Sequence, residues 1–387
     1  MKIIPYGRQD INNNDLQAVM EVMQSLWLTQ GPAIKCFEEA VAEYCGAKYA
    51  VAVNSATSAL HIAGLAADLG PGDILWTSPN TFVASANCAL YCGAKVDFVD
   101  IDHKTYNMSV SALEEKLIQA QKAGKLPKVV IPVHFAGQSC PMKEIRQLAN
   151  KYNFTVIEDA AHAIGGSYNG KKVGACEFSE MTVFSFHPVK IITTGEGGMV
   201  LTNREDLYEK LMRLRTHGIA RDERFMVKPL DGPWHYQQIE LGFNYRMTDI
   251  QAALGYSQLQ RIDEFVCRRH YLAARYDRLL KGLPVTLPWQ DPETYSAYHL
   301  YVLRLHLDEL TKTRRQIFEE LRAINVIVNV HYIPVHTQPY YEKMGFKAGA
   351  FPEAEKYYQE TLTIPLFYGL TDEDQEYVVE VLKNILV

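Results

Sequence analysis

Several common signatures are missing from this sequence of 387 residues. No apolar run reaches the roughly 18 residues that a membrane-spanning helix needs, and the opening stretch MKIIPYGRQD lacks the apolar core of a secretory signal. The seven cysteines contain no CxxC pair, so neither a disulfide framework nor a thiolate zinc site is indicated. We therefore expect a cytoplasmic protein with no membrane partner.

Signatures of nucleic-acid and nucleotide binding are also missing. Lysine and arginine form no block and the formal net charge is −6, so no nucleic-acid partner is expected. No GxGxxG follows the first predicted strand, which disfavours a nicotinamide dehydrogenase, and no complete Walker A pattern is present. The stretch HYIPVH holds His331 and His336 without a third ligand at suitable spacing, so no metal site is predicted.

The first half of the chain alternates between two kinds of pattern. Short β-rich runs occur at 49–53, 74–77, 96–99, 128–133, 155–157, 181–186 and 199–201. Helical patterns occur between the earlier runs, at 57–69, 83–91, 110–123 and 142–152. This alternation predicts an α/β fold in which helices cover both faces of a mostly parallel sheet. Such sheets bind ligands at the carboxyl ends of their strands.

The second half has a different composition. We expect one long helix over 248–280, a strand starting at His299, a helix over 314–324, a strand over 326–330 and a final helix after Thr371. The chain is accordingly predicted to form a large domain over 1–260, which begins with an N-terminal arm, and a smaller α+β domain over 261–387.

Two charged residues stand at predicted strand ends. Lys190 follows the apolar run 181–186, and an amine desolvated there would be neutral and able to form a Schiff base. A lysine in solvent is the alternative. Asp159 follows another strand in EDAAHA, where it either caps a turn or pairs with a protonated ring nitrogen, as pyridoxal phosphate requires.

Four further features could serve the same cofactor. His162 could bond the ring's phenolate oxygen, although a satisfied histidine is equally compatible with the pattern. The turn NSATSAL opens a helix whose free amides could hold a phosphate, with Ser185 adding a hydroxyl. Phe82 could stack on a flat ring or belong to the core. Asn244 and Arg246 either precede a capped helix or reach an anion, possibly across a subunit boundary.

Taken together, Lys190, Asp159, the SATS turn, Phe82 and the NYRM segment resemble the pyridoxal-phosphate sugar aminotransferases of the DegT/StrS family. The resemblance extends over essentially the whole chain, from LTQGP to HYIPVH, and implies the fold type I architecture. Some members of that family are dehydratases with histidine at the lysine position, so Lys190 favours transamination.

The resemblance also assigns roles to residues. It implies that Lys190 forms the Schiff base, Asp159 pairs with the pyridine nitrogen and Phe82 stacks on the ring. Cofactor contacts are then expected at Ala56, Thr57, Phe82, Asp159, His162, Ser185 and Asn244, with Asn244 supplied by the partner subunit of a homodimer. Substrate contacts are expected at Tyr6, Leu26, Trp27, Leu28, Thr29, His187, Arg246, His331 and Tyr332.

The stretches SFHPVK, ITTGEGG and DGPWHYQQIELGFNYRMTDIQ narrow the resemblance. They imply transfer of the amino group of L-glutamate to C4 of a UDP-linked 4-keto-6-deoxy-N-acetylhexosamine, a step of pseudaminic acid biosynthesis. Three alternatives stay open at this point: a GDP-linked 4-keto sugar, a 3-keto sugar, and a non-catalytic regulatory protein on the same scaffold.

Overall fold

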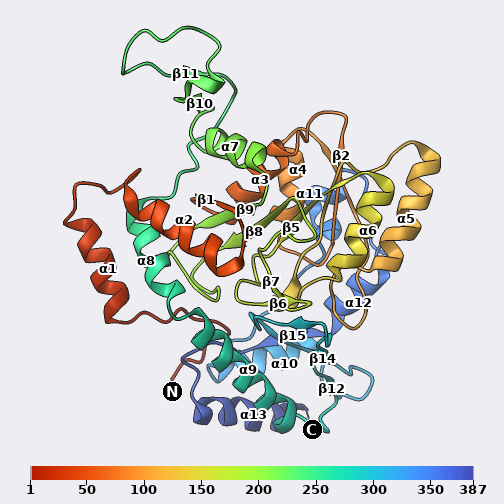
Figure 1. The fold of residues 1–387 in the computed structure, drawn as a ribbon. Coiled ribbons are helices and arrows are strands. Elements are labelled where there is room, and N and C mark those ends of the chain that lie inside the picture. Colours follow the sequence, from red (N-terminus) through yellow and green to blue (C-terminus); the bar gives the residue numbers. More distant parts are fainter. Residues whose placement is uncertain (1, 387) are drawn as a thin grey trace.

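The computed structural model describes residues 2–386, and its centre is a seven-stranded sheet (Figure 1). The strands lie in the order β1-β9-β8-β5-β4-β2-β3. Their bounds are β1 (Tyr49–Val53), β2 (Ile74–Thr77), β3 (Lys95–Phe98), β4 (Val129–Ile131), β5 (Thr155–Asp159), β8 (Met181–Ser185) and β9 (Gly198–Thr202). Only β9 runs antiparallel to its neighbours in this sheet, which confirms the mostly parallel arrangement predicted from the alternating pattern.

Helices cover both faces of this sheet because successive strand residues point to opposite sides. In β4, Val129 and Ile131 pack in the core beneath α3 (Ala56–Ala66), α4 (Ala84–Tyr91) and α7 (Glu205–Leu214). Val130 packs in the core beneath α5 (Val110–Ala123) and α6 (Met142–Tyr152). At the other end of that second face lie α2 (Pro32–Cys45) and α8 (Asp249–Leu259), with α1 (Asn13–Met23) against α8.

A second core lies around a three-stranded sheet of β12 (Val285–Thr286), β14 (Tyr301–Leu305) and β15 (Thr361–Ile364). It is covered by α10 (Arg314–Ala323) and α13 (Asp372–Leu386). Helix α9 (Ile262–Leu279) joins the two cores, because Phe265 packs in the first and Tyr276 in the second. The predicted domain boundary at 260 and 261 falls just before this helix.

The remaining elements are short. They are β6 (Ser167–Tyr168), β7 (Lys171–Lys172), β10 (Ile219–Ala220), β11 (Gln237–Gln238), β13 (Thr294–Tyr295), α11 (Pro339–Glu342) and α12 (Pro352–Glu360). The β10–β11 hairpin projects from the body of the molecule beyond α7 (Figure 1). Between residues 2 and 386, the structure contains no helix that is both long and apolar enough to cross a membrane.

Two predictions about the second half were wrong. The single helix expected over 248–280 is two helices, α8 and α9, because the chain turns at Gln260 and Arg261, and Arg261 bonds Asp10 and Asp15 of the N-terminal segment. The strand expected over 326–330 makes only isolated bridges, from Val326 to Ile4 and from Asn329 to Thr363. β14 pairs with β12 on one side and with β15 on the other, and local patterning revealed neither partner.

Candidate active site

The carboxyl ends of the central strands open into one cavity of about 930 Å³. β5 ends at Asp159, β8 ends at Ser185, and β1 leads directly into Asn54. Eleven of the residues that the sequence analysis singled out line this cavity: Tyr6, Ala56, Thr57, Phe82, Asp159, His162, Ser185, His187, Lys190, His331 and Tyr332. We call it the cofactor cavity.

Lys190 lies in the turn that follows β8, where its backbone N–H donates to the carbonyl of His187 at 2.9 Å. Burial of the side chain lowers its pKa from 10.5 to about 8, although the negative charge of Asp159 opposes the shift. The neutral, nucleophilic amine of Lys190 is therefore far more accessible near neutral pH than that of an exposed lysine.

Asp159 is buried with both carboxylate oxygens occupied. Oδ2 accepts from the Ser85 hydroxyl at 2.5 Å, and Oδ1 accepts from the backbone N–H of Ala161 at 3.1 Å. The hydroxyls of Ser85 and Thr81 lie 2.8 Å apart. Since a carboxylate can only accept, Ser85 must donate to Asp159, and Thr81 therefore donates to Ser85. This chain of bonds holds the carboxylate in one orientation inside the cavity.

The turn between β1 and α3 offers an anion site. Ser55 caps the helix by accepting from the Ser58 N–H, while the N–H groups of Ala56 and Thr57 have no partner within residues 2–386. Those amides lie at the positive end of the helix dipole. Gly198 of β9 lies directly against this turn, since a Cβ there would be 2.5 Å from the Ala56 nitrogen. The absence of a side chain at Gly198 thus allows the turn between β1 and α3 to lie against β9.

Aromatic and imidazole rings form the remaining walls. Phe82 is 59% exposed, with its ring 6.5 Å from that of Tyr332, so one face is available for stacking. The ring of Tyr6 lies 5.3 Å from that of His331. His331 Nδ1 lies 2.9 Å from the Thr363 hydroxyl, and burial lowers the pKa of His331 to about 3.

The structure places the other predicted residues elsewhere. Leu26, Trp27, Leu28 and Thr29 lie beside the start of α8, where Thr29 forms a bridge to Thr248. Asn244 is exposed in the segment that leads into α8, and Arg246 lies two residues further along the same segment. None of the six lines the cofactor cavity. We call the surface made by 26–29, Asn244 and Arg246 the α8 face.

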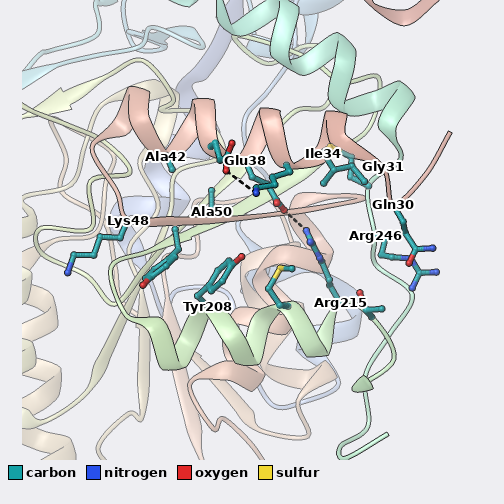
Figure 2. A pocket seen from close by; sticks show the side chains of 16 residues that line it. Gln30, Gly31, Ile34, Glu38, Ala42, Lys48, Ala50, Tyr208, Arg215 and Arg246 are labelled. Carbon is teal, nitrogen blue, oxygen red and sulfur yellow. Dashed lines mark hydrogen bonds and ion pairs between the residues drawn. The ribbon is translucent and has the colours of Figure 1, made fainter. Parts of the chain in front are cut away.

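A second cavity, of about 450 Å³, lies between α2 and α7 (Figure 2). Arg246 lines it, but Lys190 and Asp159 do not. Figure 2 shows Arg215, which follows α7, reaching Glu38 of α2; the two side chains are 2.5 Å apart. Arg215 and Glu38 therefore satisfy each other's charge in the second cavity, whereas Lys190, Asp159 and the turn between β1 and α3 all line the cofactor cavity.

Sequence reasoning missed several residues of the cofactor cavity. Ser85 holds Asp159, and its position one helical turn after Phe82 was the only local signal. Gln251 enters the cavity from α8, anchored by a bond from Nε2 to the Glu196 carbonyl at 2.8 Å. Asn329 and Val133 line the wall from segments that lie far apart in the sequence, and no local pattern could have brought them together.

These residues fit pyridoxal phosphate. The cavity combines a lysine of lowered pKa, a fixed carboxylate, a helix start with free amides and an exposed aromatic face. On a mostly parallel α/β sheet, this combination defines a fold type I pyridoxal-phosphate-dependent aminotransferase. The chain belongs to the DegT/DnrJ/EryC1/StrS aminotransferase family, whose model matches residues 9–383. Pyridoxal phosphate is the cofactor of that family.

Curated relatives span nearly the whole chain. The uncharacterized protein MJ1066 of Methanocaldococcus jannaschii is 40% identical, covering 99% of this chain and 97% of its own. The GDP-perosamine synthase of Caulobacter vibrioides is 37% identical, covering 97% and 96%. The UDP-4-amino-4,6-dideoxy-N-acetyl-beta-L-altrosamine transaminase of Campylobacter jejuni is also 37% identical, covering 99% and 98%.

Solved structures agree with the family assignment. Helicobacter pylori PseC, an aminotransferase of pseudaminic acid biosynthesis, superposes with a TM-score of 0.89 at 33% identity and covers 99% of both chains. The PLP form of the sugar aminotransferase Spr1654 from Streptococcus pneumoniae superposes with a TM-score of 0.88 at 29% identity and covers 100% of both. The chain is a sugar aminotransferase.

Proposed function

We propose that this enzyme transfers the amino group of L-glutamate to C4 of a UDP-linked 4-keto-6-deoxy-N-acetylhexosamine, as a step of pseudaminic acid biosynthesis. The observation that carries the proposal is the joint similarity to the Campylobacter altrosamine transaminase and to Helicobacter PseC over 99% of this chain. The GDP-perosamine synthase, equally identical at 37%, makes a GDP-linked 4-keto sugar the second candidate.

The chemistry follows from the cavity. The cofactor, when bound, supplies a ring that accepts the electrons of the substrate's α-carbon bond. Lys190 Nζ, as a neutral amine, would take up the proton from the α-carbon of glutamate and would return it within the cavity as a general acid. Asp159 keeps the proton on the ring nitrogen. The first half-reaction releases 2-oxoglutarate, and the second runs in the opposite direction on the keto sugar.

The same proposal gives roles to the cavity walls. Ala56, Thr57 and Ser185 hold the cofactor phosphate, and Phe82 stacks on the ring. Tyr6, His187 and His331 face the sugar nucleotide from the wall of the cavity. The neutral state of His331 supports a hydrogen-bonding role there in place of a charged one.

The α8 face completes the site of a second copy in this proposal. Leu26 is 95% exposed and Trp27 is 54% exposed, which is costly for adjacent large apolar side chains unless another surface covers them. Asn244 is also exposed, and in this proposal it reaches the phosphate bound by the partner subunit. The enzyme is accordingly proposed to be a homodimer with shared active sites.

Product analysis with a panel of keto sugars tests the assignment. The purified enzyme is incubated with glutamate and equal concentrations of the UDP-linked 4-keto-6-deoxy-N-acetylhexosamine, GDP-4-keto-6-deoxymannose and a nucleotide-linked 3-keto sugar. We expect kcat/KM to be at least about tenfold higher for the UDP sugar, because one well-placed contact accounts for that ratio. Preferred amination of the GDP sugar would instead assign the function of the perosamine relative.

A further inference from the structure

The last two residues of β5 point to opposite faces of the central sheet, as successive strand residues do. Asp159 points toward α4, where Ser85 bonds it, and lines the cofactor cavity. Glu158 points to the other face and does not line the cavity, yet it is buried as deeply as Asp159. A carboxylate buried away from the cavity needs hydrogen-bond donors of its own. One of its donors comes from the segment that follows β4.

Glu158 has partners for both of its oxygens. Oε1 accepts from the Ser179 hydroxyl at 2.5 Å and from the Thr182 hydroxyl at 3.1 Å. Oε2 lies 2.6 Å from Nε2 of His134. Burial raises the pKa of Glu158, but these donors, led by His134, outweigh burial and hold the pKa below its ordinary value. Glu158 is therefore an anion, and since an anionic carboxylate only accepts, His134 Nε2 donates to it.

His134 also bonds the neighbouring residue of β5. Its ring is completely buried, with Nδ1 accepting from the backbone N–H of Cys140 at 3.1 Å. Its backbone N–H donates to the carbonyl of Asp159 at 3.0 Å, and the N–H of Asp159 donates to the carbonyl of Pro132 at 2.9 Å. His134 thus holds Glu158 through its ring and Asp159 through its backbone.

The residues directly after His134 contact the loop that follows β5. The ring of Phe135 lies 6.1 Å from that of His162, and the backbone N–H of Ala136 donates to His162 Nδ1 at 3.2 Å. Asp159 and His162, which both line the cofactor cavity, are therefore held by one short segment. The bond between the His134 ring and Glu158 anchors that segment to β5 from the opposite face of the sheet.

We propose that His134 and Glu158 are positioning residues of this aminotransferase, whose buried bond sets the positions of Asp159 and His162 in the cofactor cavity. Neither residue of the pair lines that cavity, so the pair acts on the reaction through the groups that it holds. Small displacements are sufficient, because moving a reacting group by about 1 Å can cost about a hundredfold in rate. The proposal rests on the cofactor assignment and not on the identity of the sugar.

Two substitutions of His134 test the proposal in the holoenzyme. His134→Leu fills similar space but leaves Oε2 of Glu158 without its donor, whereas His134→Gln keeps an N–H group that can reach this oxygen. The measurement is the single-turnover rate of the half-reaction with glutamate, per cofactor-loaded site. We expect His134→Leu to lower this rate about 10- to 100-fold, and His134→Gln to recover most of the loss.

A spectroscopic readout separates positioning from stability. Asp159 keeps a positive charge on the ring nitrogen of the cofactor, and this charge lowers the pH at which the visible absorbance of the lysine-linked cofactor changes. Displacing Asp159 should therefore raise that midpoint in His134→Leu, by about one unit, and His134→Gln should stay near the wild-type value. A residue that only stabilises the fold would lower the yield of loaded protein without moving the midpoint or the rate per loaded site.

His336 provides the matched control. It is also completely buried, and its Nε2 lies 2.9 Å from Oε1 of Glu355, but neither residue lines the cofactor cavity. His336→Leu should lower stability in urea unfolding and leave the midpoint in place. Ser179→Ala removes another donor of Glu158 and should raise the midpoint by a smaller amount, which tests the proposal even if His134→Leu does not fold.

The proposal is wrong if the midpoint and the rate per loaded site stay at their wild-type values in His134→Leu and Ser179→Ala. It is also wrong if His336→Leu moves both quantities as far as His134→Leu does. None of these measurements uses a sugar, so a different keto-sugar substrate would leave every result unchanged. Failure of the sugar assignment and failure of this proposal are therefore distinguishable.

Discussion

The cofactor cavity and the α8 face differ in how far one chain completes them. In the cavity, Asp159 has partners for both oxygens, and His162 has partners for both nitrogens. On the α8 face, Leu26 and Trp27 project into solvent and Asn244 is exposed. The comparison teaches that the groups of the chemical step are preorganised within the single chain. The α8 face presents groups that would act only on something docked against it.

The largest expected effect is in the cavity, and Asp159→Asn is the variant that probes it. The amide keeps the shape but removes the charge opposite the ring nitrogen, so kcat should fall about 10²- to 10³-fold, as for other preorganised electrostatic groups. Steady-state kinetics with glutamate measure the loss.

Asp249→Asn, at the buried start of α8, is the matched control outside the cofactor cavity. Asp249 is buried like Asp159, and its carboxylate accepts two backbone N–H bonds, from Gly31 at 2.8 Å and Ala33 at 2.9 Å. This variant should lose stability with little change of kcat per folded site. Equal losses of kcat for both variants would remove the distinction between the two regions.

The next prediction concerns the α8 face and uses mixed subunits. Asn244→Asp places a negative charge where a phosphate is proposed to bind, which should reduce activity about a hundredfold. Mixing it with the inactive Lys190→Ala protein should restore activity at about a quarter of the sites. Half of randomly formed dimers contain one subunit of each variant. In such a hybrid, one of the two shared sites combines the intact Lys190 of one subunit with the intact Asn244 of the other. Activity is measured after unfolding and joint refolding. Absence of recovery would contradict the shared site.

The sequence predicted those features of the cofactor cavity that depend on short stretches of chain. Lys190 and Asp159 each follow an apolar run, and the phosphate turn joins a strand to a helix, so strand ends alone brought them to one edge of the sheet. The predicted bounds of the central strands agree with the observed bounds to within about two residues, because buried parallel strands form nearly continuous apolar runs.

The features that the sequence did not reveal depend on contacts between segments that are distant in the chain. Ser85 bonds Asp159 across 74 residues, and β15 pairs with β14 across a long excursion through α10 to α12. The break between α8 and α9 depends on Arg261 reaching the N-terminal segment. Such contacts are fixed by tertiary packing, which overrides the helical periodicity that predicted one long helix.

A smaller effect is expected at Gly198, which lies against the turn between β1 and α3. A Cβ at this position would be 2.5 Å from the Ala56 nitrogen, so Gly198→Ala must shift the phosphate turn. We expect a loss of about 1–3 kcal/mol in the free energy of unfolding together with weaker pyridoxal phosphate binding. Gly70→Ala is the control, since a Cβ there would meet nothing within 4 Å. Denaturant unfolding and cofactor titration would show whether the two variants differ.

The last effect, which develops only as the pH falls, is a change in how stability depends on pH. His331 has a folded-state pKa of about 3, below the 6.5 of an unperturbed histidine, so the unfolded chain takes up a proton that the folded chain does not. Stability from this residue is present above pH 6.5 and is lost as the pH falls toward 3, by about 1.4 kcal/mol per pH unit.

In urea unfolding of the apoenzyme between pH 6.5 and 4.5, His331→Asn should flatten that slope. Thr363→Val removes the hydrogen-bond partner of His331 but keeps the titrating ring, so it should lower stability while leaving the slope in place. A slope unchanged in His331→Asn would show that the buried wall of the cavity does not hold this histidine neutral, and would weaken the contrast with the exposed α8 face.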